Sequence, residues 1–331
     1  MYQIPNKTHW QGRIDGTTPE VLRWHQVVDM LDLSQAIAQI DTNNGVAFLG
    51  FCCDEGVRRN KGRVGAFHAP ETLRKVIANF PARQSGIDVS IYDAGNCACI
   101  DENLEKSQQE LAEKVAQLLA ANYRPMLFGG GHEIAYPHFQ GIKKAFPNAK
   151  IGVINFDAHF DIRPIDLTIG ASSGTGFWQI ATEESNFNYL VLGIQQNSNT
   201  QYLFDIADKF GVQYVLGSSF NYDERQEVIQ KISNFIEKVD IVYLTVCLDV
   251  FAAAFAPAVS ALAYNGILPD KIFQDFFKFI LRSPKVKSMD IAELNPSLDI
   301  DNRTARLAAS LIFDYVGLPF IAPVQSDLPQ K

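Results

Sequence analysis

The chain has 331 residues, of which 47% are hydrophobic and 20% are charged, and a formal net charge of −8, a composition typical of a globular protein with a large core. The acidic balance, without a run of lysine and arginine, argues against nucleic acid as a partner, and the apolar runs are too short to span a membrane. The N-terminus lacks the pattern of a signal peptide and the five cysteines are odd in number, so we expect no disulfide framework and a cytoplasmic, reducing location.

Residues 1–45 are predicted to form an N-terminal extension with a short helix near 18–40, and from residue 46 onward apolar, β-rich runs alternate with helical patterns. The predicted strands cover residues 46–51, 89–94, 124–129, 150–157, 188–194, 212–217, 240–250 and 286–293. The predicted helices cover residues 70–80, 104–121, 133–145, 200–210, 224–238, 269–282 and 302–316. Repeated β-α-β units indicate a parallel sheet covered by helices on both faces, and we expect one α/β domain over residues 1–331.

Ligands of open α/β sheets bind beyond the carboxyl ends of the strands, and polar clusters follow four of the predicted strands. The first cluster is Gly129-Gly130-Gly131-His132-Glu133, where glycines permit a tight turn before a histidine at a helix start. A glycine-rich turn alone would indicate only a connection between a strand and a helix. The histidine, together with a cluster of metal-binding type one strand later, favours a functional site.

The second cluster follows the apolar run at 151–154 and contains Asp157, His159 and Asp161. Alternating residues of an extended chain point to one side, so these three side chains are expected to converge. Two carboxylates and an imidazole in one place favour a divalent metal ion between them. The alternative is a strand end with solvated polar residues, which fits poorly with a buried sheet edge because unpaired charges are costly there.

The third and fourth clusters also lie at strand ends. Cys247 and Asp249 are two residues apart after a strongly apolar strand and therefore share a face. Taken alone, the cysteine would be a buried core residue and the aspartate a cap. The fourth cluster contains Glu293, which either holds a cationic group of a substrate or pairs with a nearby arginine.

In this order, the motifs resemble those of the ureohydrolases, the family of arginase, agmatinase and formimidoylglutamase, over roughly residues 46–317. The motifs are Gly-Gly-Gly-His-Glu at 129–133, Asp-Ala-His-Phe-Asp at 157–161, Leu-Asp-Val at 248–250, Ala-Pro-x-Val-Ser-Ala at 256–261 and Glu-Leu-Asn-Pro at 293–296. The formimidoylglutamase branch is the most similar, because Gly131 and Ser173 stand where arginases and agmatinases usually carry aspartate and histidine. The segment 54–66 is also like that branch.

The resemblance implies a three-layer α/β/α sandwich around an eight-stranded, mainly parallel sheet, with two Mn²⁺ ions in the site. By motif position, one ion would be bound by His132, Asp157 and Asp161. The other would be bound by Asp157, His159 and Asp249. Cys247 stands where the family has a second bridging carboxylate.

Cys247 leaves three outcomes open. A thiolate offers one soft sulfur where a carboxylate offers two hard oxygens, and Mn²⁺ prefers oxygen and nitrogen whereas thiolate favours softer ions such as Zn²⁺. The site would hold a thiolate-bridged pair, one ion with a weak or replaced second, or no ion. Ala258 and the segment 262–265 also depart from the family pattern, in a loop expected to border the site.

The resemblance implies hydrolysis of N-formimidoyl-L-glutamate to L-glutamate and formamide, a reaction of histidine degradation. Asp161 would take the proton of the attacking water, and Glu293 would hold the amidinium group. Guanidinium groups bind carboxylates in a bidentate manner, so arginines are expected to hold the two substrate carboxylates. The candidate substrate-binding residues are Arg163, Ser173, Arg59, Asn60 and Arg63.

Two alternatives remain at this point. In the first, the protein is a ureohydrolase that acts on another guanidine or amidine, such as agmatine or arginine. In the second, it is a non-catalytic relative whose metal site is impaired by Cys247. We expect a small-molecule substrate as partner, and the family implies a homo-oligomer.

Overall fold

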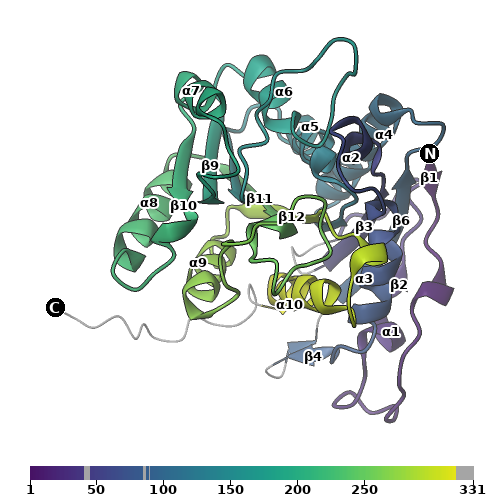
Figure 1. Ribbon diagram of the computed structural model, residues 1–331. Helices are drawn as coiled ribbons and strands as arrows, with labels where there is room; N and C mark the ends of the chain where they lie inside the picture. The colour runs from purple at the N-terminus through teal and green to yellow at the C-terminus, as the bar shows by residue number, and fades with distance from the viewer. Residues whose placement is uncertain (41–44, 85–86, 89, 318–331) are drawn as a thin grey trace.

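The computed structural model describes residues 1–40, 45–84, 87–88 and 90–317, which are built around one large sheet (Figure 1). Within these residues the strands of the sheet are β1 (Tyr2–Gln3), β2 (Asp29–Met30), β3 (Gly45–Cys52), β6 (Ser90–Ala98), β7 (Arg124–Phe128), β8 (Ile151–Phe156), β9 (Asn188–Ile194), β10 (Gln213–Leu216), β11 (Ile241–Cys247) and β12 (Val286–Ala292). Their order is β1-β6-β3-β7-β12-β11-β8-β9-β10, with β2 beside β6. Among the described strands of this sheet, only β1 is antiparallel to its neighbour. A separate antiparallel pair is formed by β4 (Arg83–Gln84) and β5 (Ile87–Asp88).

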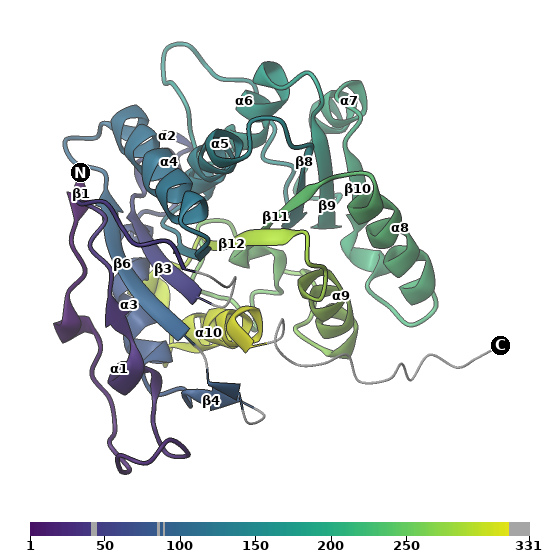
Figure 2. The same ribbon diagram turned by 180° about the vertical axis from the view of Figure 1, so that it is seen from behind.

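Helices cover both faces of the sheet, as the two opposite views show (Figures 1 and 2). One face carries α3 (Ala69–Ile77), α8 (Arg225–Glu237), α9 (Lys271–Leu281) and α10 (Arg303–Gly317). The other carries α4 (Leu104–Ala120), α5 (Ala135–Ala145), α6 (Gly176–Glu183) and α7 (Gln201–Lys209). None of the helices in the described part of the chain is long and apolar enough to cross a membrane.

The central strands are apolar on both faces because each face is buried under helices. In β8, Ile154 packs into one hydrophobic core and its neighbour Val153 into the other. In β11, Leu244 and Tyr243 divide in the same way. The sheet is thus buried between two cores. Polar side chains are therefore expected at the ends of its strands, or inside it where they have hydrogen-bond partners.

This arrangement confirms the predicted three-layer α/β/α sandwich, and each predicted strand and helix after residue 46 overlaps an observed element. The expectation of eight strands was two short, because β1 and β2 of the N-terminal segment add to the side of β6. The helix expected near 18–40 is only the single turn α1 (Trp24–Val27), which is anchored by the buried Trp24 rather than extended by an apolar stripe. The helices α2 (Glu55–Arg59) and α6 were not predicted.

Strand order explains why the four polar clusters meet. They follow β7, β8, β11 and β12, and these strands are immediate neighbours in the order β7-β12-β11-β8. Because all four strands are parallel, their carboxyl ends lie at one edge of the sheet. Segments that are up to about 160 residues apart in the chain are therefore brought to one place, as expected for the ligand-binding edge of an open α/β sheet.

Candidate metal centre

Asp157 lies at the centre of the cluster, one residue after β8. Its backbone N–H donates to the carbonyl oxygen of Leu192 (3.0 Å), which continues the pairing of β8 with β9 beyond the strand. Its Oδ1 accepts from the backbone N–H of His159 (2.7 Å), and its Oδ2 accepts from the side-chain amide of Asn155 (3.1 Å). The carboxylate is fully buried and its orientation is fixed by these bonds.

His132 approaches Asp157 from the turn that follows β7. Its Nδ1 lies 3.0 Å from Asp157 Oδ2 and 2.8 Å from Asp161 Oδ2. The turn before it passes very close to the end of β3, because a Cβ atom on Gly130 would lie 1.6 Å from the carbonyl oxygen of Cys53. Glycine is therefore required at position 130 by the approach of two backbones.

A second group of potential ligands shares Asp157. His159 Nδ1 lies 3.2 Å from Asp249 Oδ2 and 3.5 Å from Asp157 Oδ1. One ligand atom of each of these three residues lies within 4.8 Å of the other two. This triad is the set that the sequence motifs assigned to one ion.

Cys247 joins the other group. Its sulfur, with atoms of His132 and Asp157, forms a second triad within 4.8 Å, and all three side chains are buried. Burial, together with the charges of Asp157 and Asp249, raises the pKa of the Cys247 thiol well above its usual value. The thiol therefore stays protonated unless a cation lies beside it.

The electrostatics of the cluster fit a divalent cation. Asp249 Oδ1 and Glu293 Oε2 are buried and have no hydrogen-bond partner among the described residues. Burial and the charge of Asp157 raise the pKa of Asp249 to about 6, and burial and the charge of Asp249 raise the pKa of Glu293 to about 8. Buried carboxylates that lack partners and repel one another are stabilised by a positive ion, and imidazole and carboxylate donors suit Mn²⁺. The one unusual donor is the sulfur of Cys247.

The two residues predicted to be catalytic share a rare backbone conformation. Asp161 has a φ of 46° and Glu293 a φ of 73°, both in the left-handed region that non-glycine residues seldom adopt. Glu293 is held there by two bonds, from its N–H to the carbonyl oxygen of Gly130 (2.8 Å) and from the N–H of His132 to its Oε1 (2.9 Å). Strain of this kind persists where the surrounding structure fixes it, typically at functional sites.

A cavity of about 120 Å³ opens onto the cluster. Its lining contains Asn60, His159, Asp161, Arg163, Ser173, Asn199, Leu203, Asp249, Ser260, Ala261 and Glu293. Three of the predicted substrate-binding residues are therefore in the pocket, namely Asn60, Arg163 and Ser173. The Asn60 amide donates to the Ser173 hydroxyl (3.1 Å), which ties α2 to the loop before α6.

The other two predicted substrate-binding residues, Arg59 and Arg63, do not line this pocket. The Arg59 guanidinium forms ion pairs with Glu55 (2.8 Å) and Glu105 (2.5 Å), so its donors are already engaged. Arg63 donates from its side chain to the carbonyl oxygens of Val259 and Ser260. These hydrogen bonds connect the Arg63 guanidinium to the backbone of the loop that carries Ser260, and they stabilise that loop.

Asn199 and Leu203 also line the pocket and were not predicted from the sequence. The Asn199 side chain accepts from the N–H of Phe160 (3.2 Å) and donates to the carbonyl oxygen of Ala158 (2.9 Å), so it holds the backbone on both sides of His159. Asn199 could have been predicted from its position shortly after β9, at the carboxyl end of another parallel strand.

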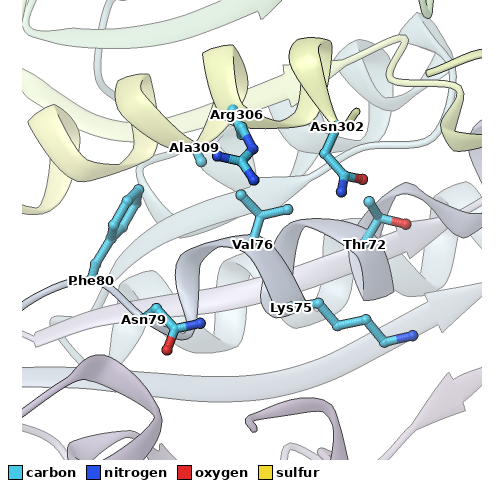
Figure 3. Close-up of a pocket in the computed structure, with 8 residues that line it drawn as sticks. All are labelled: Thr72, Lys75, Val76, Asn79, Phe80, Asn302, Arg306 and Ala309. Carbon is cyan, nitrogen blue, oxygen red and sulfur yellow. The ribbon is translucent and has the colours of Figure 1, made fainter. Parts of the chain in front are cut away.

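A roomier groove of about 630 Å³ lies elsewhere, between α3 and α10 (Figure 3). Val76 of α3 and Arg306 of α10 point toward each other across it, whereas Lys75 points away along α3. It contains none of the residues that the sequence motifs single out, so its size does not identify it with the site at the sheet edge.

Comparison with known proteins identifies the family. The sequence profile of the Arginase family matches residues 44–317, and the chain belongs to this family. It is 42% identical to a formimidoylglutamase of Clostridium tetani (strain Massachusetts / E88) over 325 residues, which cover 95% of each chain. It is 43% identical to a formimidoylglutamase of Chromobacterium violaceum over 307 residues, 91% of this chain and 95% of the relative.

Solved structures agree with the fold. The crystal structure of formimidoylglutamase from Bacillus subtilis matches with a TM-score of 0.80 at 23% identity, over 94% of this chain and 97% of that one. A crystal structure of Trypanosoma cruzi formiminoglutamase with Mn²⁺ matches with a TM-score of 0.74 at 26% identity, over 86% and 96% of the two chains. The family profile and the curated relatives confirm the resemblance drawn from the motifs.

Proposed function

We propose that this protein hydrolyses N-formimidoyl-L-glutamate to L-glutamate and formamide, as a cytoplasmic enzyme of histidine degradation that uses two Mn²⁺ ions. The similar curated proteins are formimidoylglutamases at about 42% identity over nearly the whole chain, and a structural relative contains Mn²⁺. The observation that carries the proposal is the pocket at the metal centre. His159 and Asp249 of one ligand triad line it together with Arg163, whose guanidinium has no partner among the described residues.

Asp157 would be the shared ligand of the two ions. His159 and Asp249 would complete one side, and His132 and Cys247 the other, with Asp161 beside His132. When bound, a pair of divalent ions lowers the pKa of water toward neutrality and polarises the amidine carbon–nitrogen bond.

Asp161 is the group suited to move the proton. Burial and the charge of Asp157 raise its pKa above the usual range, which makes it a better base than an ordinary aspartate. It lines the cavity, so it can take a proton from the attacking water and return it to the leaving amine nitrogen.

Glu293 is suited to hold the amidinium group. Its Oε2 is buried without a partner among the described residues, and its Oε1 is already engaged by His132. A cationic amidinium in the pocket would favour the ionised carboxylate and give the free oxygen a hydrogen-bond donor.

Arg163 is suited to hold a carboxylate of the substrate. It is the only arginine or lysine among the residues that line the described cavity, and no hydrogen bond or ion pair engages its guanidinium within the described part of the chain. A substrate with a glutamate moiety brings two carboxylates, and a charge-assisted pair to one of them is worth enough to set specificity.

The test compares substrates and one arginine variant. Mn²⁺-loaded protein should release formamide from N-formimidoyl-L-glutamate far faster than it releases urea from arginine or agmatine. Arg163→Gln should raise KM for N-formimidoyl-L-glutamate about 10-fold, because a charge-assisted bond to a substrate carboxylate is lost. Arg58→Gln is the matched control, because it removes a guanidinium that pairs with Glu55 outside the pocket. Equal KM values in the Arg163→Gln variant and in wild type would contradict the assignment.

A further inference from the structure

A chain of buried polar side chains runs inward from the metal centre, between the sheet and α5. Its members are His132, Thr245, Asp290, Tyr243, His138 and Ser288, and each is at most 1% exposed. None of the six lines the pocket. Polar groups in such a core are costly unless they are hydrogen-bonded, so each contact in the chain contributes to the stability of the core.

Asp290 is the centre of this chain. Its Oδ1 accepts from the Thr245 hydroxyl (2.6 Å). Its Oδ2 accepts from the Tyr243 hydroxyl and contacts His138 Nδ1 (2.6 Å). Burial, followed by the charge of Asp290, raises the pKa of Tyr243 well above its usual value, so the phenol keeps its proton and donates.

The register of β11 and β12 places Thr245 beside Asp290 in the parallel pairing. Tyr243 and Thr245 are two residues apart and point to the same face of β11, and Cys247 follows on that face at the metal centre. The same strand therefore supplies two bonds to Asp290 and one residue of the His132 triad.

The count of protons fixes the tautomer of His132. Its Nε2 lies 3.0 Å from the Thr245 hydroxyl oxygen. Thr245 has one hydroxyl proton, and it points to Asp290, so toward His132 its oxygen can only accept. Nε2 must then carry a proton. That leaves Nδ1, the nitrogen that faces Asp157 and Asp161, as the one free to bind a metal ion.

We propose that Asp290 and Thr245 are positioning residues, which hold His132 in the orientation and tautomer required to bind one ion of the metal pair. The inference rests on the metal centre of the proposed function. A ligating histidine commonly donates its second N–H to such a partner, and loss of that partner typically weakens metal binding 10- to 100-fold. Here the acceptor is a hydroxyl that is itself held by a buried carboxylate.

The test measures Mn²⁺ binding, with no substrate present. Thr245→Val keeps the shape of the side chain but removes the acceptor for His132 Nε2–H. Titration of metal-free protein with Mn²⁺, followed by electron paramagnetic resonance of the free ion, should show one of the two sites weakened 10- to 100-fold. Thr245→Ser restores a hydroxyl and should bind within about threefold of wild type.

Tyr243→Phe is the matched control. It also removes one hydroxyl that donates to Asp290, from the same strand and the same depth, but it leaves the bond between Thr245 and His132 in place. A purely structural role of the buried chain predicts similar losses of thermal stability in both variants and no difference in Mn²⁺ affinity. The positioning role predicts weakened Mn²⁺ binding in Thr245→Val alone.

A second measurement does not depend on variants that fold. In Zn²⁺-loaded wild type with ¹⁵N-labelled histidine, His132 should show a protonated Nε2 and a metal-bound Nδ1. The reverse assignment, equal weakening in Tyr243→Phe, or a wild type that binds no divalent ion would overturn the inference. A wild type that binds metal as described but does not hydrolyse N-formimidoyl-L-glutamate would overturn the proposed function and leave this inference standing.

Discussion

Cys247 is the residue on which the choice of metal depends most. Its sulfur lies with His132 and Asp157 in one triad, whereas the triad of Asp157, His159 and Asp249 contains only nitrogen and oxygen donors. The two sides of the centre therefore differ in softness. Of the three outcomes open from the sequence, this geometry favours one well-occupied hard site with a weak or replaced ion on the softer side.

Replacement of this sulfur should change metal affinity. Cys247→Asp supplies a hard carboxylate at the His132 side, so we expect Mn²⁺ to bind that side at least 10-fold more tightly, as measured by metal titration. The same variant should be less stable without metal, because a further buried carboxylate would face Asp157 and Asp249. Mn²⁺ affinity that is unchanged in Cys247→Asp would show that the sulfur is not part of the metal centre.

Residue identities at the site were readable from the sequence, but their backbone conformations were not. The alternation of Asp157, His159 and Asp161 predicted convergence. Asp161, however, has left the extended conformation, since its φ is 46°. Such a conformation is imposed by contacts with distant segments, as when the carbonyl oxygen of Gly130 binds the N–H of Glu293, and no local pattern encodes it.

At the scale of elements, the turn between β7 and α5 joins the metal centre to the end of β3. The N–H of Gly131 donates to the carbonyl oxygen of Cys53 (3.0 Å), and the close approach of Gly130 to the same residue leaves no room for a side chain. The position of His132 is thus determined by a contact between two loops as much as by its own turn.

A methyl group at position 130 should disturb both stability and metal binding. Gly130→Ala places a Cβ atom against the Cys53 backbone, which must move, and overpacking of this kind costs about 1–3 kcal/mol of unfolding free energy. Gly176→Ala, at the start of α6, is the control, because its Cβ would meet its nearest neighbour at an ordinary 3.5 Å. Chemical denaturation of both variants should separate them, and equal stability would contradict the close-approach argument.

Elements with strong patterns were predicted well, and short or irregular ones were not. The bounds of β9 were predicted without error because an apolar run is framed by polar residues on both sides. The helix α6 was missed because its first residue, Gly176, continues a polar, glycine-containing loop that gives no start signal. The pairing of β1 and β2 with β6 is a long-range contact of two-residue strands, and two residues carry no periodicity.

At the scale of the whole molecule, the buried carboxylates make stability depend on pH. The pKa of Asp249 is raised to about 6, that of Glu133 to about 7 and that of Glu293 to about 8, each chiefly by burial. A carboxyl whose folded pKa lies above its unfolded value contributes stability at low pH that is lost as the pH rises through the folded pKa. The raised pKa values of His132 and His159, where nearby carboxylates outweigh burial, have the same sign.

The metal-free protein should therefore melt at a lower temperature at pH 8 than at pH 5.5, by a few degrees. Mn²⁺ should remove most of this difference, since it favours the ionised carboxylates. Glu293→Gln should flatten the pH dependence of the metal-free protein, because it removes the group with the highest of the three raised carboxyl pKa values. A melting temperature that rises from pH 5.5 to pH 8 would contradict the assignment.

The central claim is that the centre around Asp157 hydrolyses N-formimidoyl-L-glutamate with divalent metal. The most direct test is a proton NMR time course of formamide formation from N-formimidoyl-L-glutamate, with wild-type protein stripped of metal and then reloaded with Mn²⁺. We predict no formamide above background from the stripped protein and continuous formation, with an equal amount of L-glutamate, after reloading. Reloaded protein that holds Mn²⁺ and forms no formamide would contradict the account.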